Sequence, residues 1–278
     1  MKKITRRSFL AAAGLTAAAL ALTACGGSSS STASSTASSA ASSEAASSSA
    51  AAELTTVEAG KLTMATNATF PPYEMTTDTG AFEGIDVDTA QAIAEKLGLE
   101  LQIDDMDFDA ALLSVQQGKA DIVMAGVTVT DERKAVMDFS DSYATGIQSI
   151  IVPEGSDIAT PDDLAGKKIG TQRGTTGYIY CSDDFGDENV VAYDSGLTAV
   201  QALNNGQVDA VVIDNAPAQE YVAANPGLVI LDTSYAEEDY AIGMAKGSAL
   251  EDAINAALEE LKADGTLQSI VDKYITAE

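Results

Sequence analysis

The sequence lacks histidine altogether, and only two of its 278 residues are cysteines. Histidine is the commonest general base and the commonest metal ligand, so its absence excludes every Ser-His or Cys-His catalytic pair. With no histidine and so few thiols, a zinc site is not expected. We therefore predict no catalytic residue, no metal site and no cofactor.

Basic residues are also scarce. Lys and Arg number 15 against 42 Asp and Glu, which gives a net charge of −27. Four of the basic residues and none of the acidic ones precede Cys25, so removal of that head would leave a net charge of −31. Such a chain repels phosphate backbones, and we expect no nucleic-acid partner.

Long apolar runs are nearly absent. The longest covers residues 9–24, after a basic head, and its length suits a signal-peptide core better than a membrane span. We predict a signal peptide over 1–24. The segment 22–25 (LTAC) resembles a lipobox, which predicts a lipidated (palmitate-bearing) Cys25 that anchors the chain to the cell membrane outside the cytoplasm. An uncleaved anchor with an unreactive Cys25 is the alternative, and residues 5–10 also resemble a twin-arginine export signal.

Residues 25–56 follow as the predicted lipidated cysteine and tether. Between 26 and 52 the chain holds only Gly, Ser, Thr and Ala, apart from Glu44. This composition cannot bury enough apolar surface to order itself, so a flexible tether with a reach on the order of 30 Å is predicted. Lipidation of Cys25 leaves Cys181 with no partner in the chain. We predict that Cys181 is a small buried residue and not a nucleophile.

Beyond Val57, short strands alternate with helices, which predicts parallel sheets with helices on their faces. The predicted strands are 61–66, 99–103, 121–125, 147–152, 168–171, 190–193, 209–213, 228–231 and 240–245. The predicted helices are 84–97, 108–117, 196–204, 216–224, 249–263 and 266–275, with three more that begin near 131, 161 and 175.

Two segments of the chain resemble each other, and we call this likeness the internal echo. Residues 113–125 resemble 200–213: in both, a helix ends at Gly, and a strand begins three residues later at Asp. The echo predicts two similar α/β lobes, although any helix–Gly–strand unit shares this pattern. Ligands of open parallel sheets bind beyond the carboxyl ends of strands, so Ala125-Gly126 and Ile213-Asp214 are expected to face one cleft.

A cleft between two lobes could hold a zwitterion. Its carboxylate needs a guanidinium and free N–H groups, and its ammonium needs a carboxylate or hydroxyl. Arg133 lies in the first turn of a predicted helix, where the helix dipole disfavours a cation. This unfavourable position indicates a functional role for Arg133. The alternative is a surface arginine paired with Asp131 or Glu132.

Three other features have equally plain alternatives. Asp214 could bind an ammonium or merely cap the next helix. The turn at 174–177 (GTTG) could present N–H groups or be an ordinary turn. The segment 70–73 (FPPY) could line a site or form a rigid turn around a packed aromatic ring.

Together with their neighbours, these segments resemble the family-3 solute-binding proteins, the polar amino-acid-binding proteins of ABC importers. The likeness runs from Leu62 to Tyr274. It rests on 70–74 (FPPYE), 84–88 (GIDVD), 107–109 (DFD), 125–133 (AGVTVTDER), 138–140 (DFS) with Tyr143, and 264–266 (DGT).

The resemblance implies an α/β fold of the type II periplasmic-binding-protein kind. In such a fold, two lobes form a clamp joined by two hinge crossings, here expected near 145–149 and 233–239. Residues 57–146 plus 238–278 would form lobe 1, and residues 147–237 would form lobe 2.

It also implies roles for ten ligand-binding residues. Arg133 would hold the ligand carboxylate with the backbones of Thr128 and Thr176. Asp214 would hold the ammonium with the Ala125 carbonyl and the Thr128 hydroxyl. The remaining positions line the ligand's side chain: Phe70 and Phe108 as walls, and Asn67, Gly126 and Gln172 at the distal end.

The implied function is extracytoplasmic binding of a polar or charged L-amino acid and its delivery, by a monomer, to ABC transporter permease subunits. Some relatives with basic ligands carry an acid where Asn67 stands, which disfavours Lys or Arg, although Glu74 is near in sequence. Arg173 would favour an acidic ligand if it faced inward, but strand alternation predicts that it points outward. The alternatives are a dehydratase-type enzyme with Glu74 as its acid or base, and a sensor subunit for a membrane receptor.

Overall fold

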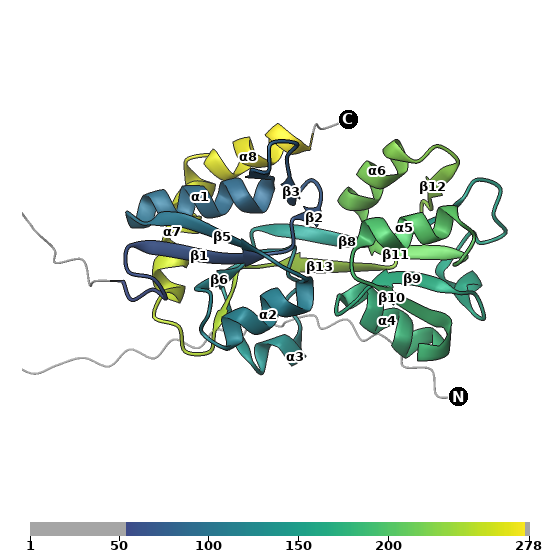
Figure 1. Ribbon diagram of the computed structural model, residues 1–278, viewed down its shortest axis with the longest axis horizontal. Coiled ribbons are helices and arrows are strands. Elements are labelled where there is room, and N and C mark those ends of the chain that lie inside the picture. Colours follow the sequence, from purple (N-terminus) through teal and green to yellow (C-terminus); the bar gives the residue numbers. More distant parts are fainter. Residues whose placement is uncertain (1–53, 276–278) are drawn as a thin grey trace, which may run out of the picture. The chain divides into compact units, whose positions relative to one another are not determined.

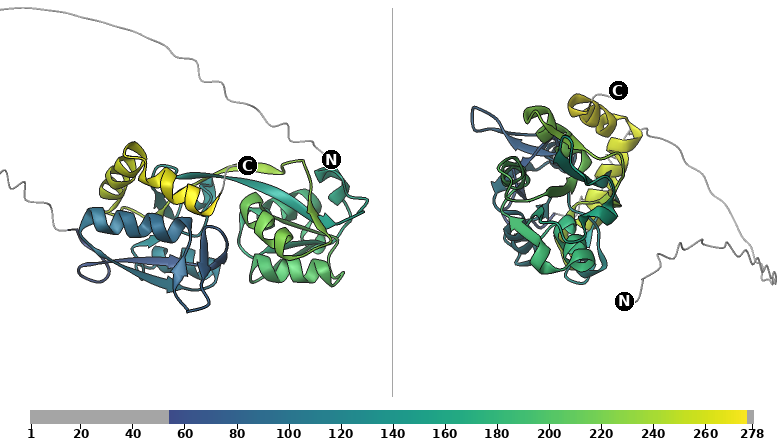
Figure 2. Two further views of the ribbon diagram at one scale, coloured as in Figure 1. Left: turned by 90° about the horizontal axis from the view of Figure 1, so that it is seen from above. Right: turned by 90° about the vertical axis from the view of Figure 1, so that its right-hand side faces the viewer.

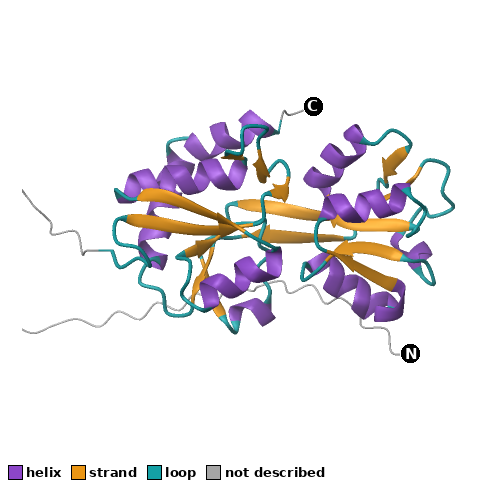
Figure 3. Ribbon diagram, in the orientation of Figure 1, coloured by secondary structure: helices purple, strands orange, loops and turns teal. Residues whose placement is uncertain are grey.

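The structure is a computed structural model, and it describes residues 54–275. The predicted signal peptide, Cys25 and almost all of the predicted tether lie outside the described residues. Three sheets form within this part of the chain (Figures 1 and 3).

The first lobe is built on a five-stranded sheet in the order β5-β1-β6-β14-β7. Helix α1 packs against α7 and α8, whereas α2 packs against β1 and β14 (Figure 1). Its strands are β1 (Lys61–Thr66), β5 (Glu100–Asp105), β6 (Ile122–Val123), β7 (Met137–Phe139) and β14 (Gly243–Ala245). Its helices are α1 (Ile85–Leu97), α2 (Phe108–Gln116), α3 (Asp131–Lys134), α7 (Glu251–Ala263) and α8 (Thr266–Tyr274).

The second lobe is built on a sheet in the order β10-β9-β11-β8-β12, with β13 also paired to β8. Its strands are β8 (Ala144–Pro153), β9 (Ile169–Gln172), β10 (Val190–Tyr193), β11 (Ala210–Asp214), β12 (Leu228–Ile230) and β13 (Ala236–Tyr240). Its helices are α4 (Thr176–Phe185), α5 (Gly196–Asn204), α6 (Asn215–Ala224) and the 3₁₀ turns η1 (Pro161–Leu164) and η2 (Asp187–Asn189).

The two lobes are joined by β8 and β13, which pair antiparallel from Ala144↔Tyr240 to Gln148↔Ala236. Both strands run between the lobes in Figure 1 and in the left view of Figure 2. The predicted two-lobe α/β fold with two crossings is therefore confirmed. We call this pair of strands the hinge ribbon.

Two predictions about strands were wrong. The expected single strand 240–245 is divided: β13 pairs with β8, whereas β14 pairs with β6 and β7 in the other lobe. An unbroken apolar run hides this division, because Ala241 and Ile242 are buried where the chain passes from one sheet to the other. The sheets are also mixed and not simply parallel, since β8 and β14 run against their neighbours.

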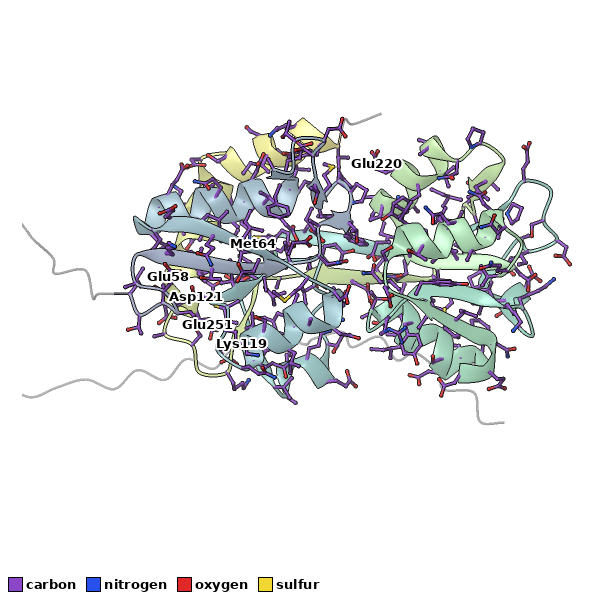
Figure 4. The ribbon with its side chains drawn as sticks, in the orientation of Figure 1. Glu58, Met64, Lys119, Asp121, Glu220 and Glu251 are labelled. Atoms are coloured by element: carbon purple, nitrogen blue, oxygen red, sulfur yellow. The ribbon has the colours of Figure 1, made fainter. Side chains whose placement is uncertain are left out.

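The internal echo corresponds to equivalent geometry in the two lobes. Gly118 and Gly206 both adopt positive φ, 66° and 67°, just after α2 and α5. Asp121, which is labelled in Figure 4, lies next in the chain. It accepts a hydrogen bond from the backbone N–H of Thr63 at the adjacent strand, at 2.8 Å. Asp209 accepts one from Lys168 N–H in the same way, at 2.7 Å. Each Asp therefore holds the start of one strand beside the next.

A small third sheet, β2 (Thr69–Phe70), β3 (Glu74–Thr76) and β4 (Phe82–Glu83), follows β1. It places Phe70 and Glu74 opposite each other in register. Gly84 then leads into α1 with its Cα so close to Tyr73 that a Cβ would lie 2.1 Å from the Tyr73 carbonyl oxygen. Only glycine permits this approach.

Cys181 is fully buried, and burial raises the pKa of its thiol to about 12. It is a packed core residue, as predicted. Between residues 54 and 275, none of the helices is both long and apolar enough to cross a membrane. The same stretch contains no group of three or more Cys, Asp or Glu side chains arranged to hold a metal ion.

Candidate ligand cavity

One cavity brings together all ten residues that the sequence analysis selected. It lies where the ends of β1, β6, β9 and β11 meet, so both echoed strands end at it. Its lining residues are Asn67, Phe70, Glu74, Phe108, Ala125, Gly126, Thr128, Arg133, Gln172, Thr175, Thr176 and Asp214. Glu74 and Thr175 are the two that the site prediction omitted.

Arg133 is buried, with 8% of its surface exposed. Its Nη1 donates to the Thr128 carbonyl at 2.8 Å, and its Nη2 donates to the Gly174 carbonyl of the other lobe at 3.2 Å. The Phe108 ring lies 5.3 Å from the guanidinium carbon. Burial lowers the pKa of Arg133, against the opposing field of Glu238. The surface ion pair with Asp131 or Glu132 is thus excluded, and a buried cation faces the cavity.

Asp214 ends β11 at the N-cap position of α6, but its side chain makes no capping hydrogen bond. It accepts a hydrogen bond from the phenol of Tyr240 on the hinge ribbon instead. Burial raises the pKa of Asp214 to about 7, and the Tyr240 hydrogen bond acts in the opposite direction. The cap alternative is therefore wrong, and Asp214 is a buried carboxyl at the cavity wall.

The turn at 174–177 joins β9 to α4. Gly174 has φ +73°, and a Cβ there would lie 1.7 Å from Oδ1 of Asp109, so the turn needs glycine. Thr175 caps α4 by accepting from Tyr178 N–H at 3.3 Å. The first N–H groups of a helix have no partner within it, so Thr176 at the start of α4 brings such groups to the cavity.

Asn67 and Gln172 meet across the two lobes. Gln172 Nε2 donates to Asn67 Oδ1 at 2.9 Å, while Asn67 Nδ2 donates to the Met106 carbonyl at 2.9 Å. Arg173 is exposed and lies 3.4 Å from Asp194 on the surface, so the prediction that it points outward is confirmed.

Phe70 and Phe108 are the aromatic walls, 7% and 6% exposed. Gly126 packs directly against Phe70: its φ is +56°, and a Cβ would lie 2.8 Å from Phe70 Cε1. Gly126 also donates its N–H to Asp86 Oδ2 at 3.0 Å. Any side chain at 126 would therefore displace an aromatic wall.

Glu74 is one of the two lining residues that the site prediction omitted. Its side chain is fully buried, and its carboxyl group lies within hydrogen-bonding reach of the Asp86 carboxyl, with no N–H or O–H donor from another type of side chain among the described residues. Burial raises its pKa well above the usual range, and the carboxyls of Asp86, Asp214 and Asp105 raise it further. The sequence signal was present, because Glu74 ends the FPPYE segment, but its direction was visible only in the structure.

The cavity therefore combines a buried guanidinium and helix N–H groups with the buried carboxyls of Asp214 and Glu74 and two aromatic walls. Such a set can bind an anion at Arg133 and a cation at Asp214 or Glu74. The cavity has room for no more than about one water molecule. Hydrogen bonds link the lobes at Arg133–Gly174, Gln172–Asn67 and Tyr221–Thr69. A larger ligand can enter only when the lobes separate.

A family model described as bacterial extracellular solute-binding proteins, family 3, matches residues 62–277. With the two-lobe fold and the closed cavity, this match shows the class: a solute-binding protein of the type II periplasmic-binding fold. The chain belongs to this family of bacterial extracellular solute-binding proteins.

Individual relatives agree with this assignment. The chain is 33% identical over 226 residues to the L-cystine-binding protein TcyJ of Escherichia coli K12, covering 80% of this chain and 85% of the relative. It is 33% identical over 228 residues to the arginine-binding extracellular protein ArtP of Bacillus subtilis, covering 78% and 87%. The crystal structure of the arginine-, lysine-, histidine-binding protein ArtJ from Geobacillus stearothermophilus matches with a TM-score of 0.75 and 34% identity, covering 78% and 96%.

Proposed function

We propose that this protein binds a free L-amino acid outside the cytoplasm and delivers it to the permease subunits of an ABC importer. Arg133, with the N–H groups at Thr128 and Thr176, receives the α-carboxylate. Asp214, with the Ala125 carbonyl and the Thr128 hydroxyl, receives the α-ammonium. The support is that these groups, distant in sequence, line one cavity with a buried cation opposite buried carboxyls.

We further propose that the ligand carries a positive side chain, with L-arginine as the first candidate. The observation that carries this is Glu74, a fully buried carboxyl at the cavity that has the Asp86 carboxyl beside it and no cationic partner among the described residues. Burial among other carboxyls disfavours the charged form of Glu74, and a ligand cation would supply the counter-charge that lets it ionise. ArtP is named as an arginine-binding protein and ArtJ as an arginine-, lysine-, histidine-binding protein, which agrees with this choice. Asn67 and Gln172 also line the cavity and carry amide oxygens.

Binding would couple to closure of the lobes. We keep the division into 57–146 plus 238–278 and 147–237 as part of this proposal, with the hinge ribbon between them. Arg133 and Asp214 come from different lobes, so a ligand held by both favours the closed form over the open one. The importer would then meet a monomer whose closed form reports occupancy.

The location of the protein is part of the same proposal. Its family is described as extracellular. We propose that residues 1–24 are removed on export, that lipid on Cys25 anchors the chain to the membrane, and that residues 25–56 act as a tether.

The proposal is tested with two ligands that share every atom position except at the distal end: L-arginine, with a charged guanidinium, and L-citrulline, with a neutral ureido group. Protein freed of ligand by unfolding and refolding is titrated with each by calorimetry, after a thermal-shift screen of the twenty amino acids, ornithine, citrulline and cystine. We expect L-arginine to bind at least tenfold more tightly than L-citrulline.

Glu74→Gln sharpens the test. Replacing the carboxyl by an amide removes the counter-charge at nearly constant shape, so the preference for L-arginine over L-citrulline should fall to about equality. Glu83→Gln, which removes a half-buried acid of the same small sheet outside the cavity lining, is the control. A thermal shift with neutral amino acids alone would refute the cationic ligand, and no shift with any amino acid would refute the binding function.

A further inference from the structure

Behind the cavity wall lies a buried carboxylate that does not line the cavity itself. Glu238 lies in the middle of β13, opposite Gly146 of β8 in the hinge ribbon, and is 6% exposed. Along β13, Glu238 and Tyr240 are buried, whereas Glu237 and Asp239 are exposed. The inward face of the hinge ribbon thus carries polar side chains, although the backbone pairing of β8 with β13 does not require them.

Three hydrogen-bond donors converge on one oxygen of Glu238. Thr128 Oγ1 donates to Oε2 at 3.1 Å, Thr176 Oγ1 at 3.0 Å and Gln148 Nε2 at 3.0 Å. Thr128 belongs to the first lobe and Thr176 to the second, so the carboxylate holds one hydroxyl from each. The loop with Thr128 is itself fixed to the ribbon, because Val129 N–H donates to the Asp239 carbonyl at 3.0 Å.

A hydroxyl has one hydrogen to donate and two lone pairs that accept. The two hydroxyl oxygens lie 3.5 Å apart, farther than either lies from Glu238 Oε2, so each hydroxyl donates its one hydrogen to Glu238. Only their lone pairs then remain for a molecule in the cavity that both residues line. Gln148 Nε2 also approaches Thr176 Oγ1, at 3.5 Å, from the donor side. Both hydroxyls therefore act as hydrogen-bond acceptors toward a molecule in the cavity.

We propose that Glu238 is a positioning residue for specificity: it orients the hydroxyls of Thr128 and Thr176 as acceptors and so selects ligands that carry an α-ammonium group. This inference rests on the proposed function, since it concerns the same cavity. An ammonium has three hydrogens and no lone pair, so it suits such a pair of hydroxyls. Two of those hydrogens go to Asp214 and the Ala125 carbonyl, and the third goes to a hydroxyl. An α-hydroxy acid has one hydrogen for all of these acceptors, and a carboxylic acid with only hydrogen at the same carbon leaves them all without a donor.

The test measures the ratio between the dissociation constants of an amino acid and its deaminated analogue, and not the affinity for one ligand alone. L-arginine is compared with 5-guanidinopentanoate, and L-glutamine with glutaramate, each acid being the amino acid without its α-ammonium. Dissociation constants are measured by calorimetry on the full chain, freed of ligand. Glu238→Met removes the acceptor at similar length, and Glu238→Gln keeps an acceptor oxygen without the charge. Glu237→Met, on the exposed face of the same strand, is the matched control.

We expect the ratio between amino acid and deaminated acid to fall by at least about tenfold in Glu238→Met. It should be largely restored in Glu238→Gln and unchanged in Glu237→Met. If Glu238→Met does not fold, as judged by circular dichroism, Glu238→Ala makes the same test, because water admitted to the gap can donate or accept and sets no direction.

Each other outcome overturns the inference. A full ratio in Glu238→Met, or an equal loss in Glu238→Gln and Glu238→Met, would show that hydroxyl direction is not what selects the ammonium, while the proposed amino-acid binding would stand. Wild-type protein that binds neither L-arginine nor L-glutamine would overturn the proposed ligand classes, and this inference with them.

Discussion

The phenol of Tyr240 donates a hydrogen bond to Oδ1 of Asp214. Tyr240 ends β13 of the hinge ribbon, whereas Asp214 ends β11 in the second lobe. The Tyr240 ring also covers Gly146 of β8 so closely that a Cβ there would lie 2.4 Å from Cζ. A residue of the hinge ribbon therefore fixes the carboxylate of Asp214, the proposed ammonium-binding group. Its position depends on the arrangement of the two crossing strands.

Tyr240→Phe should weaken ligand binding by about tenfold, because it removes a buried hydrogen bond to a carboxylate. The same bond opposes the rise in the pKa of Asp214 caused by burial. Its loss should therefore move the acidic limb of the pH–affinity profile to higher pH. Calorimetric titration between pH 5 and 8 measures both effects. Tyr274→Phe, which removes a phenol bonded to Asp88 away from the cavity, should leave both unchanged.

Arg133→Ala should cost at least about 2 kcal/mol of ligand binding, about 30-fold in Kd, since it removes the charge-assisted contact to the carboxylate. Arg173→Ala removes an exposed guanidinium only, and its affinity should match the wild type. Unchanged binding in Arg133→Ala would place the ligand carboxylate elsewhere.

The stability of the ligand-free protein should decrease as the pH rises from about 4 to 7. Burial raises the pKa of Asp86 to about 6 and that of Asp214 to about 7, from 3.8. The folded state then binds protons more tightly than the unfolded chain. This contribution is complete below pH 4 and is lost as the pH passes through the folded-state values, by up to about 1.4 kcal/mol per pH unit for each group.

Urea unfolding at pH 4, 5, 6 and 7 measures that decrease. Asp214→Asn cannot titrate, so its free energy of unfolding should fall less over the same range. Equal slopes for the wild type and Asp214→Asn would contradict a raised pKa at this position.

Gly126→Ala should lower both stability and ligand affinity. It forces a Cβ into a positive φ, at a cost of about 1–2 kcal/mol, and pushes it against Phe70. Gly118→Ala is the matched control: its φ is +66° and open space surrounds it, so it bears the backbone cost alone. We expect similar affinity to the wild type in Gly118→Ala, and weaker affinity in Gly126→Ala only. Thermal unfolding and calorimetry separate the two costs.

Much of the fold could be predicted from the sequence because local sequence patterns agree with the observed structure. β1 was predicted at 61–66 and is observed there, and α1 ends before Gly98, which adopts φ 70°. The echo between 113–125 and 200–213 predicted that Gly126 and Asp214 would face one cleft, and both line the cavity. These features depend on hydrophobic period, on glycine at positive φ and on strand ends, all of which are local.

The division of residues 240–245 between β13 and β14 could not be predicted from local patterns. Residues 240–245 form one apolar run in the sequence, and only the pairing of β13 with β8 and of β14 with β6 separates them. Pairing partners far apart in the chain leave no local pattern. The same is true of Glu238, whose donors lie 110, 90 and 62 residues away.

The sequence by itself determined the alternation of strands and helices, the outward direction of Arg173 and the residue types available for a zwitterion, because each follows from spacing and chemistry along the chain. Only the tertiary structure decided that Arg133 is buried, that Asp214 bonds Tyr240 and not its own helix, and that Glu74 lines the cavity as a buried carboxyl. Burial and hydrogen-bonding partners are set by contacts between the two lobes and the hinge ribbon, and such contacts exist only once the chain has folded.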